Sequence, residues 1–258
     1  MYDLLGIGRA ALDAQQTRLA VTANNIANVN TTAFKASRPS FQDLVYQELA
    51  PRAIPLDRAA ARAQAGTGTA VVASVRDDTP GALLPTGRAL DLAIEGEGFF
   101  AVTTPAGETL YTRDGAFYLD AEGRLVNGAG YAVAPAIALG EGATGLEIRP
   151  DGTVAAVKAD GATEEAGRLK LYTFANPAGL EARGGNLFAA TDASGAPREI
   201  APGEGAGLIR SGWLEASNTD LAGEMVALVL AQRAYQAAAR TIQAADEMWA
   251  EANELGPR

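Results

Sequence analysis

Carboxylates are the side chains with the greatest capacity for chemistry in this sequence. It contains 31 Asp and Glu residues, no His and no Cys. Without the last two types, the chain lacks the commonest general base, a thiolate nucleophile and the usual zinc ligands. Two carboxylates at a suitable separation could still hydrolyse a glycosidic bond. Because abundant acids usually form a solvated surface and no pair stands isolated in an apolar stretch, we predict no catalytic residues and no enzyme.

Three glycine motifs resemble ligand-binding loops in their residue pattern alone. The run from Gly96 to Ala101 matches Gly-x-Gly-x-x-Ala, but it precedes a strand-like aromatic run, and Glu95 and Glu97 would repel a pyrophosphate. Asp114-Gly115 and Asp151-Gly152 lack the further acidic residues of a calcium loop and are typical of turns. We therefore predict no cofactor and no metal site.

The charge balance bears on the possible partners. The formal net charge is -10 and the sequence pI is about 4.6, so the surface repels phosphate backbones and we expect no nucleic-acid partner. The first residues do not form a Sec-type signal, and no apolar run reaches the ~18 residues that a spanning helix needs. We expect no direct membrane insertion, and a location in the cytosol or export without a cleaved signal.

The two ends of the chain carry apolar residues that repeat every seven positions. A helix expected from about residue 3 to 28 places large apolar residues along one narrow line, as does a second from about 220 to 252. These two lines are typical of coiled-coil seams that pair with each other or with copies of the chain. The seam residues are Leu5, Leu12, Leu19 and Ile26 at one end, and Leu221, Leu228, Tyr235, Ile242 and Trp249, with Met225 and Gln232 in the alternate position, at the other.

The middle of the chain has a different pattern. Residues 34–75 give a weak signal that favours an extended connector. From about 76 to 215, short alternating runs lie between hairpin dipeptides such as Asn127-Gly128, which predicts an all-β domain. The predicted fold class is therefore α+β, mainly β, with an all-β central domain flanked by coiled-coil helices. The expected boundaries are 1–33, 34–75, 76–215 and 216–258.

Several stretches resemble the signatures of bacterial flagellar rod and hook proteins. The amino-terminal signature covers residues 12–35, and its centre is Asn24-Asn25-Ile26-Ala27-Asn28. The central β-domain signature covers 91–100, 111–117 and 184–188. The carboxyl-terminal signature includes Ser217-Asn218-Thr219-Asp220-Leu221 and Gln232-Arg233-Ala234-Tyr235. The matches follow one order almost from end to end, and the length and residues 41–47 are most similar to the distal rod member of the family.

The resemblance implies a structural subunit of the flagellar basal body. The terminal helices would form the inner layer of a hollow, self-assembling tube that transmits torque from the motor to the hook. Its expected partners are copies of itself, the proximal rod proteins, the hook protein, the surrounding ring proteins and the flagellar type III export apparatus. The Ala- and Arg-rich tract at 51–65 departs from the family pattern. A proximal rod or hook-type subunit remains an alternative, as does an adhesin-like β-domain on a helical oligomer stalk.

Polar residues near the seams have two interpretations. The resemblance favours an intersubunit hydrogen-bonding set for Asn24, Asn25 and Asn28, whereas simple capping of the helix end is the alternative. Gln232 has the same two interpretations. We expect Tyr235 and Trp249 to pack in the seam. The predicted assembly interface thus comprises Leu5, Leu12, Leu19, Asn24, Asn25, Ile26, Asn28, Leu221, Met225, Leu228, Gln232, Tyr235, Ile242 and Trp249.

Overall fold

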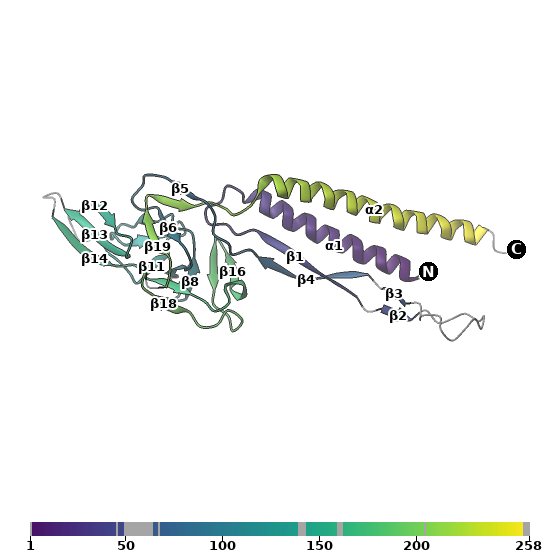
Figure 1. Cartoon of the computed structure of the whole chain (residues 1–258), viewed down its shortest axis with the longest axis horizontal. Coiled ribbons are helices and arrows are strands. Elements are labelled where there is room, and N and C mark those ends of the chain that lie inside the picture. The colour runs from purple at the N-terminus through teal and green to yellow at the C-terminus, as the bar shows by residue number, and fades with distance from the viewer. Residues whose placement is uncertain are drawn as a thin grey trace. The chain divides into compact units, whose positions relative to one another are not determined.

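A long helix at each end and a β-rich middle make up the chain (Figure 1). The computed structural model describes residues 2–44, 46–48, 64–66, 68–138, 143–158, 162–203 and 205–254. The order of elements confirms the predicted fold class. Two compact units are present. The helical unit comprises residues 1–27, 37–76 and 220–258, and the β unit comprises 28–36 and 77–219.

Helices α1 (Tyr2–Ala27) and α2 (Leu221–Glu254) lie side by side within the helical unit (Figure 1). They run antiparallel, because Gly8 lies opposite Ile242 and Asn25 bonds to Glu224. The first turn of α2 is capped where the Asp220 carboxylate accepts a 3.1 Å bond from the backbone N–H of Ala222. Of the two pairings open from the sequence, the structure thus contains the one within a single chain.

A two-stranded antiparallel ribbon packs on α1. It consists of β1 (Ser37–Asp43) and β4 (Thr69–Arg76), and its register pairs Ser37 with Arg76. A second short pair, β2 (Tyr46–Glu48) with β3 (Gln64–Gly66), belongs to the same unit. The ribbon begins within the expected connector at 34–75 and ends one residue beyond it, at Arg76. Most of the unmatched tract at 51–65 lies outside the described residues.

The β unit is built from antiparallel sheets. Among the described residues, the largest has seven strands in the order β16-β17-β8-β7-β11-β10-β9. Their bounds are Glu181–Gly184, Leu187–Ala189, Thr109–Thr112, Phe100–Thr103, Ala132–Ala134, Leu125–Val126 and Tyr118–Leu119. A three-stranded sheet has β12 (Ala143–Ile148), β13 (Thr153–Lys158) and β14 (Thr163–Arg168). The two-stranded pairs are β19 (Leu208–Ser211) with β6 (Leu92–Glu95), β15 (Leu171–Thr173) with β18 (Arg198–Ile200), and β20 (Trp213–Glu215) with β5 (Leu83–Pro85), and η1 (Pro177–Gly179) is a short 3₁₀ turn.

Strand β7 is buried on both faces, which places it at the centre of the β unit. Phe100 and Val102 belong to the larger, mostly aliphatic cluster, whereas Ala101 points to a second cluster that is rich in aromatic rings. Phe100 meets Phe117 edge-on at 5.3 Å in the first cluster, and Tyr111 meets Phe174 edge-on at 4.9 Å in the second. Although aromatics are only 6% of the chain, they are therefore concentrated in the core.

Candidate assembly interface

Close approach of α1 and α2 depends on a glycine. Gly8 is buried, and a Cβ atom at this position would lie 2.6 Å from Cγ1 of Ile242. Gly6, two residues earlier, would meet nothing within 4 Å. The absence of a side chain at Gly8 thus allows Ile242, one of the predicted seam residues, to pack directly on the backbone of α1.

Small side chains form the most deeply buried part of this helix pair. Ala231 and Ala245 on α2 are 0% and 4% exposed, and Ala14 on α1 is 2% exposed. These alanines were not predicted from the sequence, because the seven-residue repeat was traced through the large apolar residues. A signal was present, since Ala231, Ala238 and Ala245 recur every seventh residue beside the predicted seam.

The structure separates the predicted interface residues into two groups. One group is half-buried and consists of Leu5, Leu12, Leu19, Ile26, Leu228, Ile242 and Trp249 in the helical unit and Asn28 at the start of the β unit. The other group is exposed and consists of Asn24, Leu221, Met225, Gln232 and Tyr235. A single seam that contacts one partner helix cannot hold both groups.

Asn25 is buried and makes its hydrogen bonds within the chain. Its Nδ2 group donates to the backbone oxygen of Ser37 at 2.9 Å and to Oε1 of Glu224 at 3.1 Å. Its Oδ1 atom accepts from the backbone N–H of Ser37 at 3.0 Å. With 1% exposure, Asn25 ties α1, β1 and α2 together at one end of the helical unit.

A buried group of three charges lies in the β unit, and sequence analysis did not predict it. The Glu215 carboxylate, on β20, accepts from Lys35 Nζ, from Arg113 Nε at 2.9 Å and from the backbone N–H of Gly81 at 2.9 Å. The three charged side chains are almost fully buried. Lys35 also donates to the backbone oxygen of Thr79 at 2.7 Å. This Lys35–Glu215–Arg113 cluster joins segments that are as much as 180 residues apart.

The Gly96-Glu97-Gly98 segment forms a loop around the side chain of Arg113. Its guanidinium donates to the backbone oxygens of Gly98 at 3.1 Å, Ile94 at 3.3 Å and Gly96 at 2.7 Å. Gly96 and Gly98 have φ angles of 123° and 134°, a region that favours glycine. These glycines therefore shape a loop whose carbonyls bind an arginine of the same chain.

Electrostatics in this cluster keep Glu215 ionised. Burial acts to raise the pKa of Glu215, but the charge of Arg113 and the hydrogen bond from Lys35 outweigh it, so the pKa lies below its ordinary value. Burial lowers the pKa of Lys35, and Glu215 opposes that change only in part. The ion pairs and the carbonyl acceptors together reduce the cost of desolvating these charged groups.

Further polar contacts hold the residues next to this cluster. Thr32 donates to the Asp114 carboxylate at 3.0 Å, and Asn186 donates to the backbone oxygen of Thr32 at 2.8 Å. Asn218 accepts from the backbone N–H of Ala36 at 2.8 Å and donates to the backbone oxygen of Asp77 at 2.8 Å. Each of the three sequence signatures therefore contributes residues to one hydrogen-bonded region of the β unit.

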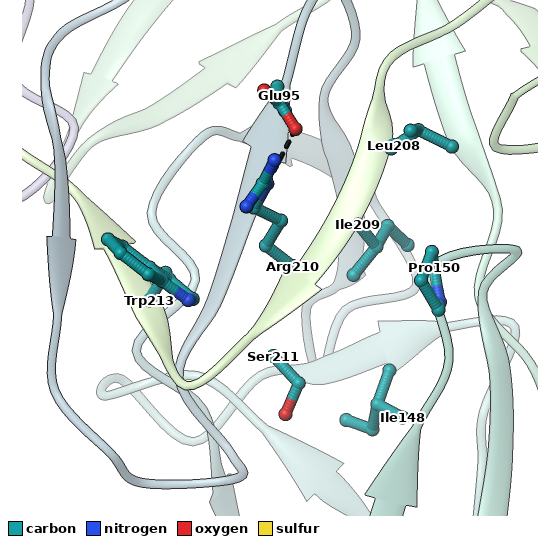
Figure 2. A pocket seen from close by; sticks show the side chains of 8 residues that line it. All are labelled: Glu95, Ile148, Pro150, Leu208, Ile209, Arg210, Ser211 and Trp213. Carbon is teal, nitrogen blue, oxygen red and sulfur yellow. Dashed lines mark hydrogen bonds and ion pairs between the residues drawn. The ribbon is translucent and has the colours of Figure 1, made fainter.

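The surface of the β unit has a hollow of about 360 Å³ between β6, β12, β19 and β20 (Figure 2). Ile148, Pro150 and Ile209 make much of its lining apolar. Figure 2 shows the side chains of Arg210 and Glu95 pointing toward each other, at 2.5 Å between Nε and Oε2. Because each of these charges neutralises the other, the hollow does not offer a free acid–base pair.

The part of the chain that the structure describes contains neither a metal-binding cluster nor a membrane-spanning helix. No group of three or more Asp or Glu side chains gathers there in a way that could hold a metal ion. No described helix combines the length and the apolar character needed to cross a membrane.

Three family models match the chain in succession. The model of flagella basal body rod proteins matches residues 5–35, that of the flagellar hook protein FlgE/F/G D1 domain matches 93–156, and that of the flagellar basal body rod FlgEFG protein C-terminal region matches 210–255. Lys35, Arg113 and Glu215 lie in the first, second and third of these regions. The buried cluster therefore has one member in each matched region.

Full-length relatives point to the same group of proteins. The chain is 39% identical to the flagellar basal-body rod protein FlgG of Buchnera aphidicola subsp. Acyrthosiphon pisum, over 99% of this chain and 100% of that one. It is 42% identical to FlgG of Agrobacterium fabrum, over 95% of each chain. A match of 40% to the flagellar hook protein FlgE of Treponema pallidum covers 49% of this chain and 28% of that protein.

These matches and the helix–β–helix fold define a structural subunit of the flagellar axis. The chain belongs to the family of flagellar hook and basal-body rod proteins. The end-to-end matches to FlgG confirm the resemblance to the distal rod protein, and with it the predicted location in the flagellar basal body.

Proposed function

We propose that the chain polymerises through its helical unit into a hollow helical tube, and that this tube transmits torque from the motor to the hook. The observation that carries the proposal is the division of the predicted interface. Ile242 packs against Gly8 of α1 and Leu228 is half-buried, whereas Leu221 and Met225 remain exposed for another copy. An apolar side chain left in water favours association, since burying it removes apolar area from water.

Substitution in the seam tests this proposal. Ile26→Asp or Leu228→Asp places a charge at a half-buried position of the predicted seam, where the cost of desolvating the charge opposes packing. Either variant should fail to form polymers in light scattering and electron microscopy. Ala121→Asp, in an exposed turn of the β unit, is the matched control and should polymerise normally. Normal rods of Leu228→Asp would contradict the proposal.

The partners follow from the same role. Proximal rod proteins and the hook protein would contact the two ends of the polymer, and ring proteins would surround it. Delivery by the flagellar type III export apparatus would supply the subunits. Deletion of the gene, followed by imaging of basal bodies, should show assembly that stops before the distal rod. Complete rods in the deletion strain would assign the chain to another position.

The proposal includes no catalytic role. The Glu95 and Arg210 side chains of the β-unit hollow pair with each other, which supports this view. The sharpest enzymatic alternative is hydrolysis of the cell wall by two carboxylates. A zymogram with peptidoglycan should remain uncleared by the purified protein, and a cleared band would overturn this part of the proposal.

A further inference from the structure

The turn between β10 and β11 is organised around one side-chain amide. The backbone N–H of Asn127 donates to the oxygen of Tyr131 at 2.9 Å, and its backbone oxygen accepts from Gly130 at 2.9 Å. The side-chain oxygen of Asn127, Oδ1, accepts from the backbone N–H groups of Ala129 at 3.0 Å and Tyr131 at 2.9 Å. The main chain of the turn therefore fixes the position of the Asn127 amide.

The residue after Asn127 leaves its backbone nitrogen open. Gly128 is exposed, and a Cβ atom at this position would meet nothing within 4 Å. Within the described part of the chain, neither the N–H of Gly128 nor Nδ2 of Asn127 makes a hydrogen bond. The sequence contains no other Asn-Gly pair. A nitrogen free to react thus lies next to an amide that is held in place.

These two groups are the reactants of an intramolecular deamidation. The nitrogen of Gly128 gives up its proton, attacks Cγ of Asn127 and forms a new C–N bond. The bond from Cγ to Nδ2 then breaks, and Nδ2 takes up the proton and leaves as ammonia. Water opens the five-membered succinimide ring that remains, which gives aspartate or isoaspartate at this position. The sequence of steps consumes only water and adds one negative charge.

We propose that Asn127 and Gly128 form a self-modifying site, in which the folded turn accelerates deamidation of Asn127. Negative charge develops on Oδ1 as the nitrogen attacks, and the N–H groups of Ala129 and Tyr131 already point at that atom. Backbone donors aimed at a developing oxyanion lower the barrier of acyl transfer. The nucleophile is the next atom group along the chain, so no encounter is required. This property goes beyond the proposed function and does not depend on polymerisation.

Other asparagines of the chain lack this arrangement. Asn176 precedes Pro177, whose nitrogen carries no hydrogen and cannot close the ring. Asn25 is 1% exposed, and its Nδ2 group is held by two acceptors. Asn186 donates from Nδ2 to the backbone oxygen of Thr32. Loss of ammonia from Asn25 or Asn186 would break these contacts, whereas Asn127 would lose none.

The aspartate product fits the same turn. A carboxylate at position 127 can accept the hydrogen bonds from Ala129 and Tyr131, and bonds to a charged acceptor are stronger than bonds to a neutral one. The isoaspartate product adds one carbon to the main chain and would displace the bonds to Gly130 and Tyr131. We therefore expect the β unit to stay folded in the aspartate form, with one more charge on its surface.

A first experiment tests the site. The full chain is incubated at mildly alkaline pH, and peptide mapping by mass spectrometry follows each asparagine. Asn127 should convert while Asn176 stays intact. Gly128→Ala fits the turn but crowds the nitrogen, so it should slow conversion at least about tenfold, the effect of about 1.4 kcal/mol on a barrier. Gly6→Ala, another exposed glycine with nothing within 4 Å, is the control and should convert at the original rate.

A second experiment tests the contribution of the fold. The same conversion is measured at the same pH in the native chain and in the chain unfolded by urea, where the donors to Oδ1 are lost. The native chain should convert at least about tenfold faster, because oxyanion donors act only in the folded turn. Slower conversion in the native chain would show that the hydrogen bonds protect Asn127. That result, no conversion in either state, or an unchanged rate in Gly128→Ala would each overturn the proposal.

Discussion

At the scale of single residues, Glu215 has the most demanding position in the β unit. Its carboxylate has no exposed side-chain surface and accepts hydrogen bonds from Lys35, Arg113 and the backbone of Gly81. Removal of its charge would leave two buried cations without their counter-ion. Breaking a buried ion pair in this way is far more costly than losing a pair at the surface.

Glu215→Gln should therefore destabilise the β unit strongly. We expect the free energy of unfolding to fall by about 3–5 kcal/mol at neutral pH, the typical cost of leaving a buried charge unpaired. Denaturant unfolding followed by tryptophan fluorescence would measure it, since Trp213 lies two residues away. Glu108→Gln makes the same change at an exposed turn and should have little effect. Equal stability of the two variants would show that the cluster contributes little.

Acid should act on the same carboxylate. The pKa of Glu215 lies below its ordinary value of 4.5 because the charged carboxylate is more stable in the folded state than in the unfolded chain. Its contribution to stability is complete above about pH 4.5 and is lost as pH falls through the folded pKa. The free energy of unfolding should thus decline less steeply below pH 4.5 in Glu215→Gln than in the unsubstituted chain.

Asp114 makes an opposing contribution, so the comparison must be between these two chains. Burial raises the pKa of Asp114, and the hydrogen bonds from Ala116 and Thr32 offset this only in part. Its contribution to stability therefore falls as pH rises from its ordinary value of 3.8 toward the folded pKa. Asp114 is present in both chains, and its effect cancels in the difference. Identical pH profiles would mean that Glu215 does not carry the acid sensitivity.

At the scale of elements, the helix pair shows how far the sequence pattern reaches. The seven-residue repeat predicted two helices and placed Leu228 and Ile242 at their contact. It did not find the role of Gly8, because only the opposing Ile242 makes a small residue necessary there. Nor could the repeat show which of its apolar residues are buried within the helix pair of one chain and which stay exposed. That division depends on which side α1 occupies, which is a property of the folded helical unit.

Gly8→Val should push the two helices apart. The new Cβ would lie 2.6 Å from Ile242, so the pair must separate or distort, at a cost of about 1–3 kcal/mol. Thermal unfolding followed by helix circular dichroism should start at a lower temperature. Gly6→Val makes the same change where nothing lies within 4 Å and serves as the control. Ile242→Ala should restore part of the loss in Gly8→Val, and absence of any rescue would argue against this contact.

The β unit was easier to anticipate in outline than in detail. Hairpin dipeptides predicted short antiparallel strands, and the structure confirms the all-β middle. Hydrogen bonds between residues distant in sequence could not be predicted, because no local sequence pattern pairs Lys35 with Glu215 or Thr32 with Asp114. The loop at Gly96 illustrates the difference. Its glycines were correctly excluded as a nucleotide site, but their actual ligand, Arg113, became visible only in the fold.

At the scale of the whole molecule, the β unit should fold without the helices. The β unit, residues 28–36 and 77–219, contains both cores, all three members of the Lys35–Glu215–Arg113 cluster and the bonds made by Asn218; a continuous fragment 28–219 also includes residues 37–76 of the helical unit. We expect a fragment of these residues to unfold in one cooperative transition, with dispersed NMR signals in water. A fragment that lacks fixed tertiary structure would show that the β unit depends on the helical unit.

The position of Glu215 along the chain has a consequence for the order of events during folding. A chain that emerges amino end first presents Lys35 early, Arg113 midway and Glu215 last. Until the last of them arrives, closing the β unit would enclose two cations with no anion, which opposes closure. We therefore expect the cluster to oppose closure of the β unit until residue 215 is available. In a chain that is incomplete, or that ends before residue 215, the β unit should stay unfolded. Folding of the β unit becomes favourable once nearly the whole chain is present.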